Sequence, residues 1–389
     1  MLRFWTAGES HGEALVAWVS GIPAGLKIDQ AYVDRELWRR QQGYGRGGRQ
    51  KIEQDSAHIV SGVRHGQTIG SPISLLIENK DWKNWQESLP VGEGDPAKHK
   101  AVASPRPGHA DLAGALKFNF PEARYVLERA SARESAARVA VGAMAKLFLR
   151  ELGVEVLSHV LSVGGAGVGD AEIGWEKISE LSRRSEVLLN CADPQAEQAM
   201  KAEIDNALKT GDSAGGIFEV VAHRVPPGLG SYVNWDERLD TLLAAAVMSL
   251  QAVKAVEIGS GVAAASMPGS AVQDPIGYDR SKHRFLRRSN RAGGIEGGVS
   301  NGEDIIVRGY LKPISTLRRP LESVDFQSRE PVKAAYERSD VCVVPAAGVA
   351  GEAMVALTVA RAAREKFGGD SMEEVLRNFR GYLDQLKQF

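Results

Sequence analysis

Three long segments of this sequence are apolar on almost every side of a helix, and they limit what the chain can fold into. They cover residues 131–152, 236–256 and 348–367. A helix without a distinct polar face is stable only when it is buried on several sides. The first segment is also rich in alanine, whose small side chain lets neighbouring helices pack closely. The sequence therefore predicts a large core with buried helices at its centre.

Shorter segments show the alternation or the β-branched residues that are typical of strands. A helix is predicted at 29–42, where apolar residues recur at helical spacing. Another helix starts at a capping box formed by Ser371 and Glu374. The charged segment 172–210 is predicted to be a helical excursion on the surface. The predicted strands are 2–6, 14–19, 59–63, 73–77, 154–163, 216–225, 258–265 and 304–311.

Composition excludes several classes of protein. The 389 residues carry a net charge of −1, so no overall field attracts nucleic acid or an anionic membrane. The two cysteines, Cys191 and Cys342, have no metal-ligand spacing and fit a reducing compartment better than a disulfide scaffold. The N-terminus does not resemble a signal peptide, and no uninterrupted apolar run approaches the roughly 18–20 residues of a membrane helix. We expect a soluble, cytoplasmic protein without a metal site.

Arginine and glycine are concentrated near the N-terminus, just after the polar turn Gly8-Glu9-Ser10-His11-Gly12. Arg40, Arg46 and Arg49 lie within or beside a segment, residues 43–48, that contains four glycines. Glycine lets the backbone approach a ligand closely, and the planar guanidinium group suits phosphate and carboxylate. Similar clusters recur around His109 and Arg338. The pattern predicts an anion site gathered from distant parts of the chain.

Two more segments are typical of ligand sites. Residues 81–109 form a long polar stretch rich in proline and glycine, and a loop of that length is usually functional or disordered. Because its end, 104–109, has such a specific local sequence, we expect it to cover a ligand. Ser131 stands at the start of the alanine-rich helix, close to Arg129 and Arg133. A helix N-terminus beside arginine is suited to an anion.

Two other interpretations of these motifs remain open. Residues 8–12 match G-x-S-x-G, the nucleophile elbow of α/β-hydrolases, with Ser10 as nucleophile. That motif works only at a turn from strand to helix, and here the following residues alternate like a strand. The segment 43–49 could instead bind nucleic acid, although only Tyr44 adds an aromatic side chain. Neither a Walker loop nor a Rossmann fingerprint is present in the sequence.

Taken together, the motifs resemble the chorismate synthase family in order and spacing. The resemblance is carried by residues 8–12 with 21–23, by the run 128–135, and by 338–340 through 351–354. Residues 104–109, 291–298 and 312–316 match as well. The resemblance extends over nearly the whole chain; the segment 173–208 is the part that does not match.

The resemblance implies a fold and a reaction. The implied fold is α/β: a β-α-β sandwich in a single large domain, residues 1–389, with long buried central helices flanked by mainly antiparallel sheets. Residues 172–210 would be a variable helical excursion. The implied reaction is the anti-1,4-elimination of phosphate from 5-enolpyruvylshikimate 3-phosphate, which gives chorismate and requires reduced FMN without net redox change. The implied assembly is a homotetramer. FMN would be reduced either by the enzyme itself with NADPH or by a separate flavin reductase.

The resemblance also implies roles for individual residues. His11 would protonate or hydrogen-bond the reduced flavin, His109 would donate a proton towards the departing phosphate, and Asp340 would act as a base at flavin N5. In members able to reduce flavin, Arg40 and Arg46 would also contact NADP. The implied substrate-binding residues are Ser10, Arg40, Arg46, Arg49, Arg106, Ser131 and Arg133. The implied cofactor-binding residues are Arg129, Ala130, Ser131, Gln251, Ala252, Gly297, Lys312, Pro313, Ile314, Ser315, Thr316 and Arg338.

Overall fold

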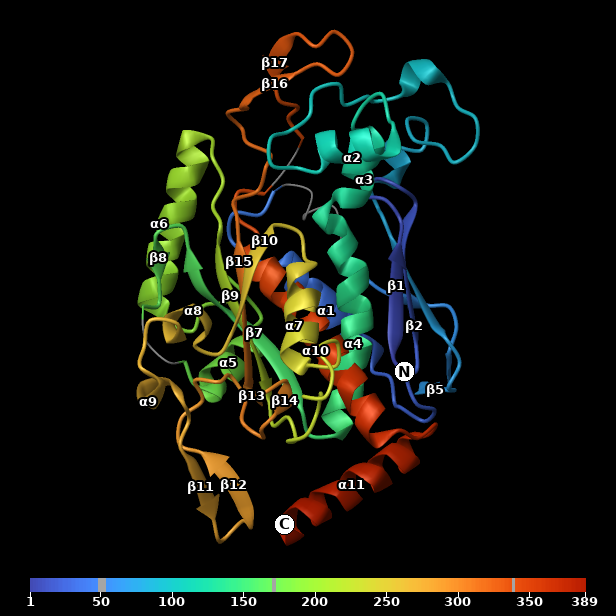
Figure 1. Cartoon of the computed structure of the whole chain (residues 1–389). Coiled ribbons are helices and arrows are strands. Elements are labelled where there is room, and N and C mark those ends of the chain that lie inside the picture. The colour runs from blue at the N-terminus through green and yellow to red at the C-terminus, as the bar shows by residue number, and fades with distance from the viewer. Residues whose placement is uncertain (48–53, 170–172, 338–339) are drawn as a thin grey trace.

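Two antiparallel sheets enclose a layer of helices in the computed structural model, which describes residues 1–47, 54–169, 173–337 and 340–389 (Figure 1). The first sheet has the order β1-β2-β6-β3 and the second has the order β10-β15-β9-β7-β8. The predicted sandwich of helices between mainly antiparallel sheets is confirmed. The strands of the first sheet are β1 Arg3–Ala7, β2 Ala14–Ser20, β6 Ile73–Glu78 and β3 His58–Ile59; those of the second are β10 Val253–Ile258, β15 Ile305–Leu311, β9 Gly216–His223, β7 Glu155–Val163 and β8 Ala166–Gly167.

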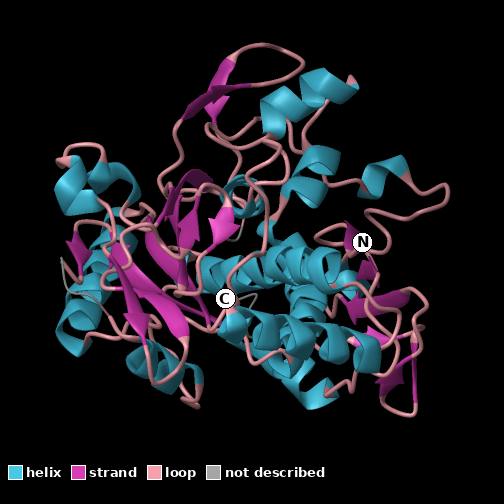
Figure 2. Cartoon of the chain, turned by 60° about the horizontal axis from the view of Figure 1, so that its bottom comes forward, coloured by secondary structure: helices cyan, strands magenta, loops and turns pink. Residues whose placement is uncertain are grey.

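The central layer is formed by four helices, which Figure 2 shows between the two groups of strands. They are α1 Gln30–Gln41, α4 Ser135–Glu151, α7 Leu239–Met248 and α10 Val344–Phe367. Small residues let α4 and α10 approach closely. A Cβ atom added at Gly142 of α4 would lie 2.3 Å from the Cβ of Ala353 on α10, so a larger side chain at residue 142 would force the two helices apart.

The predicted helices at 131–152 and 348–367 exist, but the prediction of one helix over 236–256 was wrong. The helix α7 ends at Met248, and β10 begins at Val253. Just before β10, Ala252 adopts a left-handed backbone conformation with φ of +68°, which a continuous helix does not allow. The β-branched residues that follow pair with β15 instead. The predicted strand 258–265 was also wrong: β10 already ends at Ile258, and the short helix α8 follows at Gly261–Ala264.

The strand predicted at 59–63 is also interrupted. Residues 58–59 form β3, whereas Val63–Arg64 form β4 of a separate hairpin with β5, Gln67–Thr68. Gly62 lies between them with φ of +82°, a conformation that glycine adopts at little cost. The turn at Gly62 therefore directs the chain out of the first sheet.

Helix α10 is long and apolar enough to span a membrane, although Glu352 and Arg361 interrupt its apolar run. Its 24 residues have a mean hydropathy of 1.3 in the most apolar window. However, 89% of that window is buried inside the protein. The apolar surface of α10 is covered by α4, α7 and the second sheet, so the helix forms part of the core.

A network of charged side chains is buried inside this core and joins three helices to a strand. Glu352 of α10 is fully buried and accepts hydrogen bonds of 2.7 Å from both terminal nitrogens of Arg39 on α1. Lys146 of α4 binds Glu352 and also Glu36 of α1. The backbone N–H of Ser158 on β7 donates to the same Glu352 carboxylate at 2.8 Å. The network fixes α1, α4, α10 and β7 relative to one another.

The remaining elements lie around the sandwich. The C-terminal helix α11, Met372–Gln388, starts at the predicted capping box of Ser371 and Glu374. Residues 173–210 contain α5 Trp175–Ser182 and α6 Pro194–Thr210. Other elements are α8 Gly261–Ala264, α9 Gly269–Val272, and the strand pairs β11 Ile276–Asp279 with β12 Arg284–Arg287 and β13 Ile295–Glu296 with β14 Val299–Ser300.

A cover lies over one end of the helical layer, at the top of Figure 1. It has its own small apolar cluster of Val102, Ala123 and Leu127, against which Phe326 and Ala335 pack. Backbone hydrogen bonds join Phe326 to Ala103 and Ala335 to Ser104, so distant parts of the chain form one unit. Its elements are η2 Trp82–Asn84, η3 Pro96–Lys98, α2 Asp111–Phe118, α3 Arg124–Ala130, β16 Glu322–Val324 and β17 Pro331–Lys333.

Candidate active site

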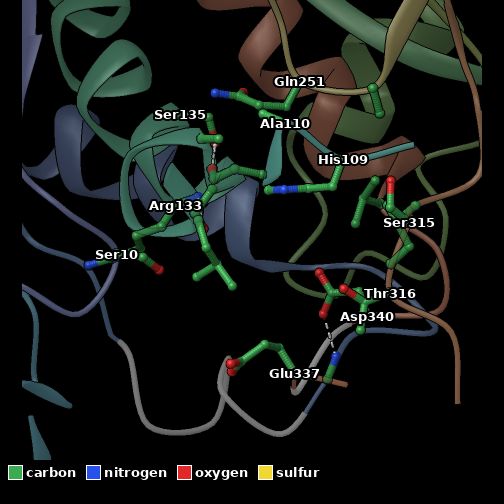
Figure 3. A pocket seen from close by; sticks show the side chains of 18 of the residues that line it. Ser10, His109, Ala110, Arg133, Ser135, Gln251, Ser315, Thr316, Glu337 and Asp340 are labelled. Carbon is green, nitrogen blue, oxygen red and sulfur yellow. Dashed lines mark hydrogen bonds between the residues drawn. The ribbon is translucent and has the colours of Figure 1, made fainter. Parts of the chain in front are cut away.

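A cavity of about 780 Å³ lies where the cover meets the end of the helical layer, within the size range of small-molecule sites, roughly 300–1,000 Å³. Figure 3 shows Ser10, Arg133, His109 and Asp340 around this space, although they come from distant segments. Most of the predicted site residues line the cavity. These are Ser10, His11, Arg40, Arg46, Arg106, His109, Ala130, Ser131, Arg133, Gln251, Ala252, Lys312, Ile314, Ser315, Thr316 and Asp340.

Among the described residues, three of the predicted site residues do not line this cavity: Arg129, Gly297 and Pro313. Pro313 lies between two residues that do, and Gly297 lies in the turn between β13 and β14. Arg129 donates hydrogen bonds to the backbone oxygens of Gly8 and Thr6, so it holds the N-terminal turn. Arg49 and Arg338 lie outside the described residues.

His11 lies in the turn between β1 and β2, which is a hairpin and not the strand-to-helix turn of a nucleophile elbow. Glu128 of α3 holds this turn: its Oε2 accepts from the His11 backbone N–H at 2.7 Å, and its Oε1 is 2.9 Å from His11 Nδ1. The indole of Trp85 stacks on the imidazole with ring centroids 4.0 Å apart. Burial raises the pKa of Glu128, but the hydrogen bonds from His11 outweigh it, so the pKa lies below its usual value.

His109 has a similar carboxylate partner. Its Nδ1 lies 2.6 Å from Oδ1 of Asp111, which is fully buried. Arg106 binds both oxygens of Asp111, with its Nε at 2.8 Å and its Nη2 at 3.0 Å. Burial raises the pKa of Asp111, but the hydrogen bonds from His109 and Arg106 outweigh it and hold the pKa well below its usual value. An ionised carboxylate can only accept, so Nδ1 of His109 carries a hydrogen and donates it to Asp111.

Two arginines of the cavity share a single carboxylate. Asp55 binds Nη2 of Arg40 at 2.9 Å and Nη1 of Arg133 at 2.7 Å. Burial, together with the positive charges of Arg133 and Arg46, lowers the pKa of Arg40 to about 10 against the opposing effect of Asp55. The positive charge of this cluster is therefore only partly compensated, and the cluster would be stabilised by an anion.

Arg46 extends the cluster towards Asp340. Its Nη1 lies 2.9 Å from Oδ2 of Asp340, whose other oxygen accepts from the Gly47 backbone N–H. In the described part of the chain, the buried Nε atoms of Arg40 and Arg46 have no hydrogen-bond partner. Buried polar atoms are almost always paired, so these two donors indicate an acceptor that is supplied by a ligand.

A group of hydroxyls and one lysine lies on the side of the cavity formed after β15. Nζ of Lys312 donates to Oγ of Ser315 at 3.0 Å, and Thr316 accepts from Nη1 of Arg106 at 2.9 Å. Gly108, with φ of +78°, lies next to this group: a Cβ atom added there would be 3.4 Å from Ser315 Oγ. Burial, followed by the charge of Lys254, lowers the pKa of Lys312. Such a group is suited to bind phosphate.

The cavity also has an apolar wall. It is formed by Leu127 on the cover, Leu250 after α7, and Val343, Ala346 and Ala347 at the start of α10. An apolar wall beside convergent cations and hydroxyls fits a ring system that carries a phosphate. The residues present therefore fit a flavin mononucleotide together with an anionic substrate.

Sequence reasoning missed Asp55, Trp85, Lys100, Arg124, Glu128 and Glu337 as members of the site. Trp85 and Lys100 belong to the segment 81–109, which we expected to cover a ligand, and an aromatic side chain in a polar loop was a usable signal. Arg124 and Glu128 are four residues apart on α3, a helix that was not predicted. Asp55 carried no signal of its own, because its importance depends on two arginines that lie far away in sequence.

The chain is similar to chorismate synthases along its whole length. The family model described as chorismate synthase matches residues 2–363. A chorismate synthase of Koribacter versatilis is 71% identical over 393 residues, which cover 100% of both chains. One from Geobacter sulfurreducens is 54% identical over 395 residues, again with 100% of both chains covered. A crystal structure of chorismate synthase superposes with a TM-score of 0.80 at 42% identity, covering 100% of this chain and 99% of that one.

Proposed function

The chain belongs to the chorismate synthase family, and we propose that the cavity beneath the cover is its active site. The enzyme is a lyase of the shikimate pathway, which leads to the aromatic amino acids. It converts 5-enolpyruvylshikimate 3-phosphate into chorismate by losing phosphate and a hydrogen from C6. The reaction is difficult because this hydrogen is barely acidic and because the hydrogen and the phosphate must leave in an anti-1,4 elimination.

The family uses reduced flavin, and we propose that FMN is the form bound in this cavity. When bound, reduced flavin would supply reversible one-electron chemistry for the loss of phosphate and of the C6 hydrogen. Lys312, Ser315 and Thr316 would hold its phosphate, and the apolar wall would accept its ring. The other proposed contacts are Arg129, Ala130, Ser131, Gln251, Ala252, Pro313, Ile314 and Arg338. Gly297 stays a predicted FMN contact, although it does not line the cavity.

The substrate carries a phosphate and carboxylates, and we propose that the arginine cluster binds them. Arg40 and Arg133 are held in place by Asp55, and Arg106 is held by Asp111. Guanidinium groups that are already fixed lose little freedom on binding, and each charge-assisted contact contributes about 1.5–3 kcal/mol. Ser10, Arg46, Arg49 and Ser131 complete the proposed substrate site, and Arg40 and Arg46 are also the proposed NADP contacts.

Three side chains would handle protons in this site. His109 would donate a proton towards the departing phosphate through Nε2, since its Nδ1 is held by Asp111. His11 would hold a proton at the cofactor, and Asp340 would act as the base. Histidine suits these roles because its ordinary pKa lies near neutrality. The cover would exclude water from the reacting atoms.

The observation that carries this proposal is the convergence of His11, His109 and Asp340 on one cavity, beside the buried Nε atoms of Arg40 and Arg46, which have no partner in the described part of the chain. The direct test is an anaerobic assay with 5-enolpyruvylshikimate 3-phosphate and chemically reduced FMN, with chorismate measured by absorbance. We expect stoichiometric chorismate and phosphate without net consumption of reduced flavin. Chorismate formation that does not depend on flavin would contradict the proposal. Repeating the assay with oxidised FMN and NADPH distinguishes intrinsic flavin reduction from dependence on a separate reductase.

Assembly and location are further parts of the proposal. Tyr232, Val233 and Trp235 are 70–79% exposed in one loop, and clustered exposed apolar residues often mark contacts between subunits. This supports a homotetramer, which light scattering would test through the molar mass. Cys191 and Cys342 are both free and buried, which supports the reducing conditions of the cytoplasm and can be checked by cell fractionation.

A further inference from the structure

The contacts of His11 point to a residue that determines which of its ring nitrogens exchanges a proton. We propose that Glu128 is a positioning residue that keeps His11 protonated at Nδ1, so that its proton exchange takes place at Nε2. This inference rests on the proposed function, which gives His11 a proton to hold.

Glu128 is bound to His11 through both of its oxygens. Oε2 accepts from the backbone N–H of His11 and Oε1 faces the ring nitrogen Nδ1. Glu128 is 4% exposed, and Nη1 of Arg124 lies 3.3 Å from its Oε1. The backbone N–H of Ser10 donates to the backbone oxygen of Glu128 at 2.9 Å. The carboxylate therefore has a fixed place relative to the turn that carries the imidazole.

The charge of Glu128 decides the tautomer of His11. The hydrogen bonds from His11 and the nearby Arg124 favour the ionised carboxylate, which has no hydrogen to donate. Nδ1 must then carry the hydrogen of the contact at 2.9 Å, whether the ring is neutral or charged. The ring nitrogen whose protonation changes is therefore Nε2.

Trp85 fixes the remaining freedom of the ring. Its indole stacks on the imidazole at an interplanar angle of 27°, and its Nε1–H donates to Asp81 at 3.2 Å. Lys100 and Arg124 lie over the indole, at 4.1 and 5.2 Å from its centroid. The stack restricts the ring plane, while Glu128 selects the nitrogen that faces α3.

Replacing Glu128 with glutamine is expected to reverse the tautomer. The backbone N–H of His11 can only donate, so the amide oxygen must take the place of Oε2. The amide NH₂ then takes the place of Oε1 and faces Nδ1. A donor at that position requires Nδ1 to accept, which moves the hydrogen of the neutral ring to Nε2. The substitution changes the volume of the side chain very little.

Glu128 gives a cleaner test than the corresponding residue at His109. Asp111 holds Nδ1 of His109 in the same way, but it also makes three hydrogen bonds to Arg106. A change at Asp111 would therefore disturb a proposed substrate arginine as well as the tautomer.

The test is a double-mutant cycle of Glu128→Gln and His11→Ala in the anaerobic assay with reduced FMN. We expect Glu128→Gln to lower kcat about 10–100-fold, by analogy with changes to the carboxylate partner of a metal-bound histidine, with little change in KM. In the His11→Ala background, the same substitution should change kcat less than about twofold, because its effect acts through the ring. A similar loss in both backgrounds would show a structural role and overturn the proposal.

A second measurement decides the tautomer independently of catalysis. Nitrogen NMR of protein labelled with ¹⁵N-histidine, assigned with His11→Ala, should show a hydrogen on Nδ1 of His11 in the wild type and on Nε2 in Glu128→Gln. The same pattern in both proteins would overturn the proposal. If His11→Ala kept full turnover, the proposed function of His11 would fail, while the NMR result would still decide the role of Glu128.

Glu337→Gln is the matched control. Glu337 lines the same cavity and also binds Arg124, at 2.9 Å. Unlike Glu128, it makes no described contact with the ring of His11. Its effect on kcat should multiply with that of His11→Ala, and the NMR pattern of His11 should stay as in the wild type. Coupling as strong as that of Glu128 would contradict the assignment to Glu128. Thermal unfolding of each variant verifies that it is folded.

Discussion

Replacing His109 with alanine is expected to lower kcat about 10²–10⁴-fold, the range that is typical for the loss of one general acid. The expectation follows from the place of His109 in the cavity and from its fixed ring. Asp111 holds Nδ1 at 2.6 Å, so the imidazole presents Nε2 as its other proton-exchanging atom. Since the proposed FMN contacts lie on other segments, the dissociation constant for FMN should change little. Single-turnover assays under anaerobic conditions, together with a fluorescence titration of FMN, measure both quantities.

His223→Ala provides the matched control for this experiment. Nδ1 of His223 lies 2.8 Å from Asp304, and its ring stacks on Trp175, but it lies outside the cavity. Loss of this imidazole should leave kcat within about twofold of the wild type, because sites that are far apart are coupled only weakly. Wild-type turnover in His109→Ala would remove His109 from the chemistry.

The second large effect is expected on stability. Glu352→Gln should lower the free energy of unfolding by about 3–5 kcal/mol, because it leaves Arg39 and Lys146 as buried cations with too little negative charge. The carboxylate of Glu352 is fully buried and is bound by Arg39, Lys146 and Ser158. Denaturation by urea, followed by circular dichroism, measures the difference. The network also fixes the end of α1, where Arg39 is followed by Arg40 of the proposed active site.

Glu365→Gln is the control on the same helix. Glu365 pairs with Arg361 one turn away, and both side chains are about 40% exposed. Exposed pairs of this kind contribute about 0–1 kcal/mol, so this variant should unfold almost like the wild type. A loss in Glu352→Gln no larger than that of the control would show that the buried network does not stabilise the core.

The central layer of the fold could be predicted because its residues leave few alternatives. The segments 131–152 and 348–367 have no polar face, and burial between two sheets is what such helices require. The boundary between α7 and β10 could not be predicted, since the left-handed turn at Ala252 and the pairing with β15 are decided by tertiary contacts. Propensity alone does not distinguish a buried helix from a buried strand over a short apolar run.

The site could be predicted only in part for a related reason. His11, His109 and the arginines were found through motifs that have a chemical meaning of their own. Their partners Asp55 and Glu128 act through contacts with residues that are distant in sequence, and Asp111 lies on α2, a helix that was not predicted. A carboxylate without a motif is usually a solvated surface group, so only its burial against a cation reveals its role.

The most direct test of the proposed active site is a crystal structure of the protein with FMN and 5-enolpyruvylshikimate 3-phosphate. We expect both ligands in the cavity between the cover and the start of α10, with the substrate phosphate within hydrogen-bonding distance, about 2.6–3.2 Å, of His109 or the arginine cluster. The Nε atoms of Arg40 and Arg46 should then have acceptors, supplied directly or through ordered water. Ligands bound elsewhere, with His11, His109 and Asp340 all out of reach of both, would contradict the proposed site.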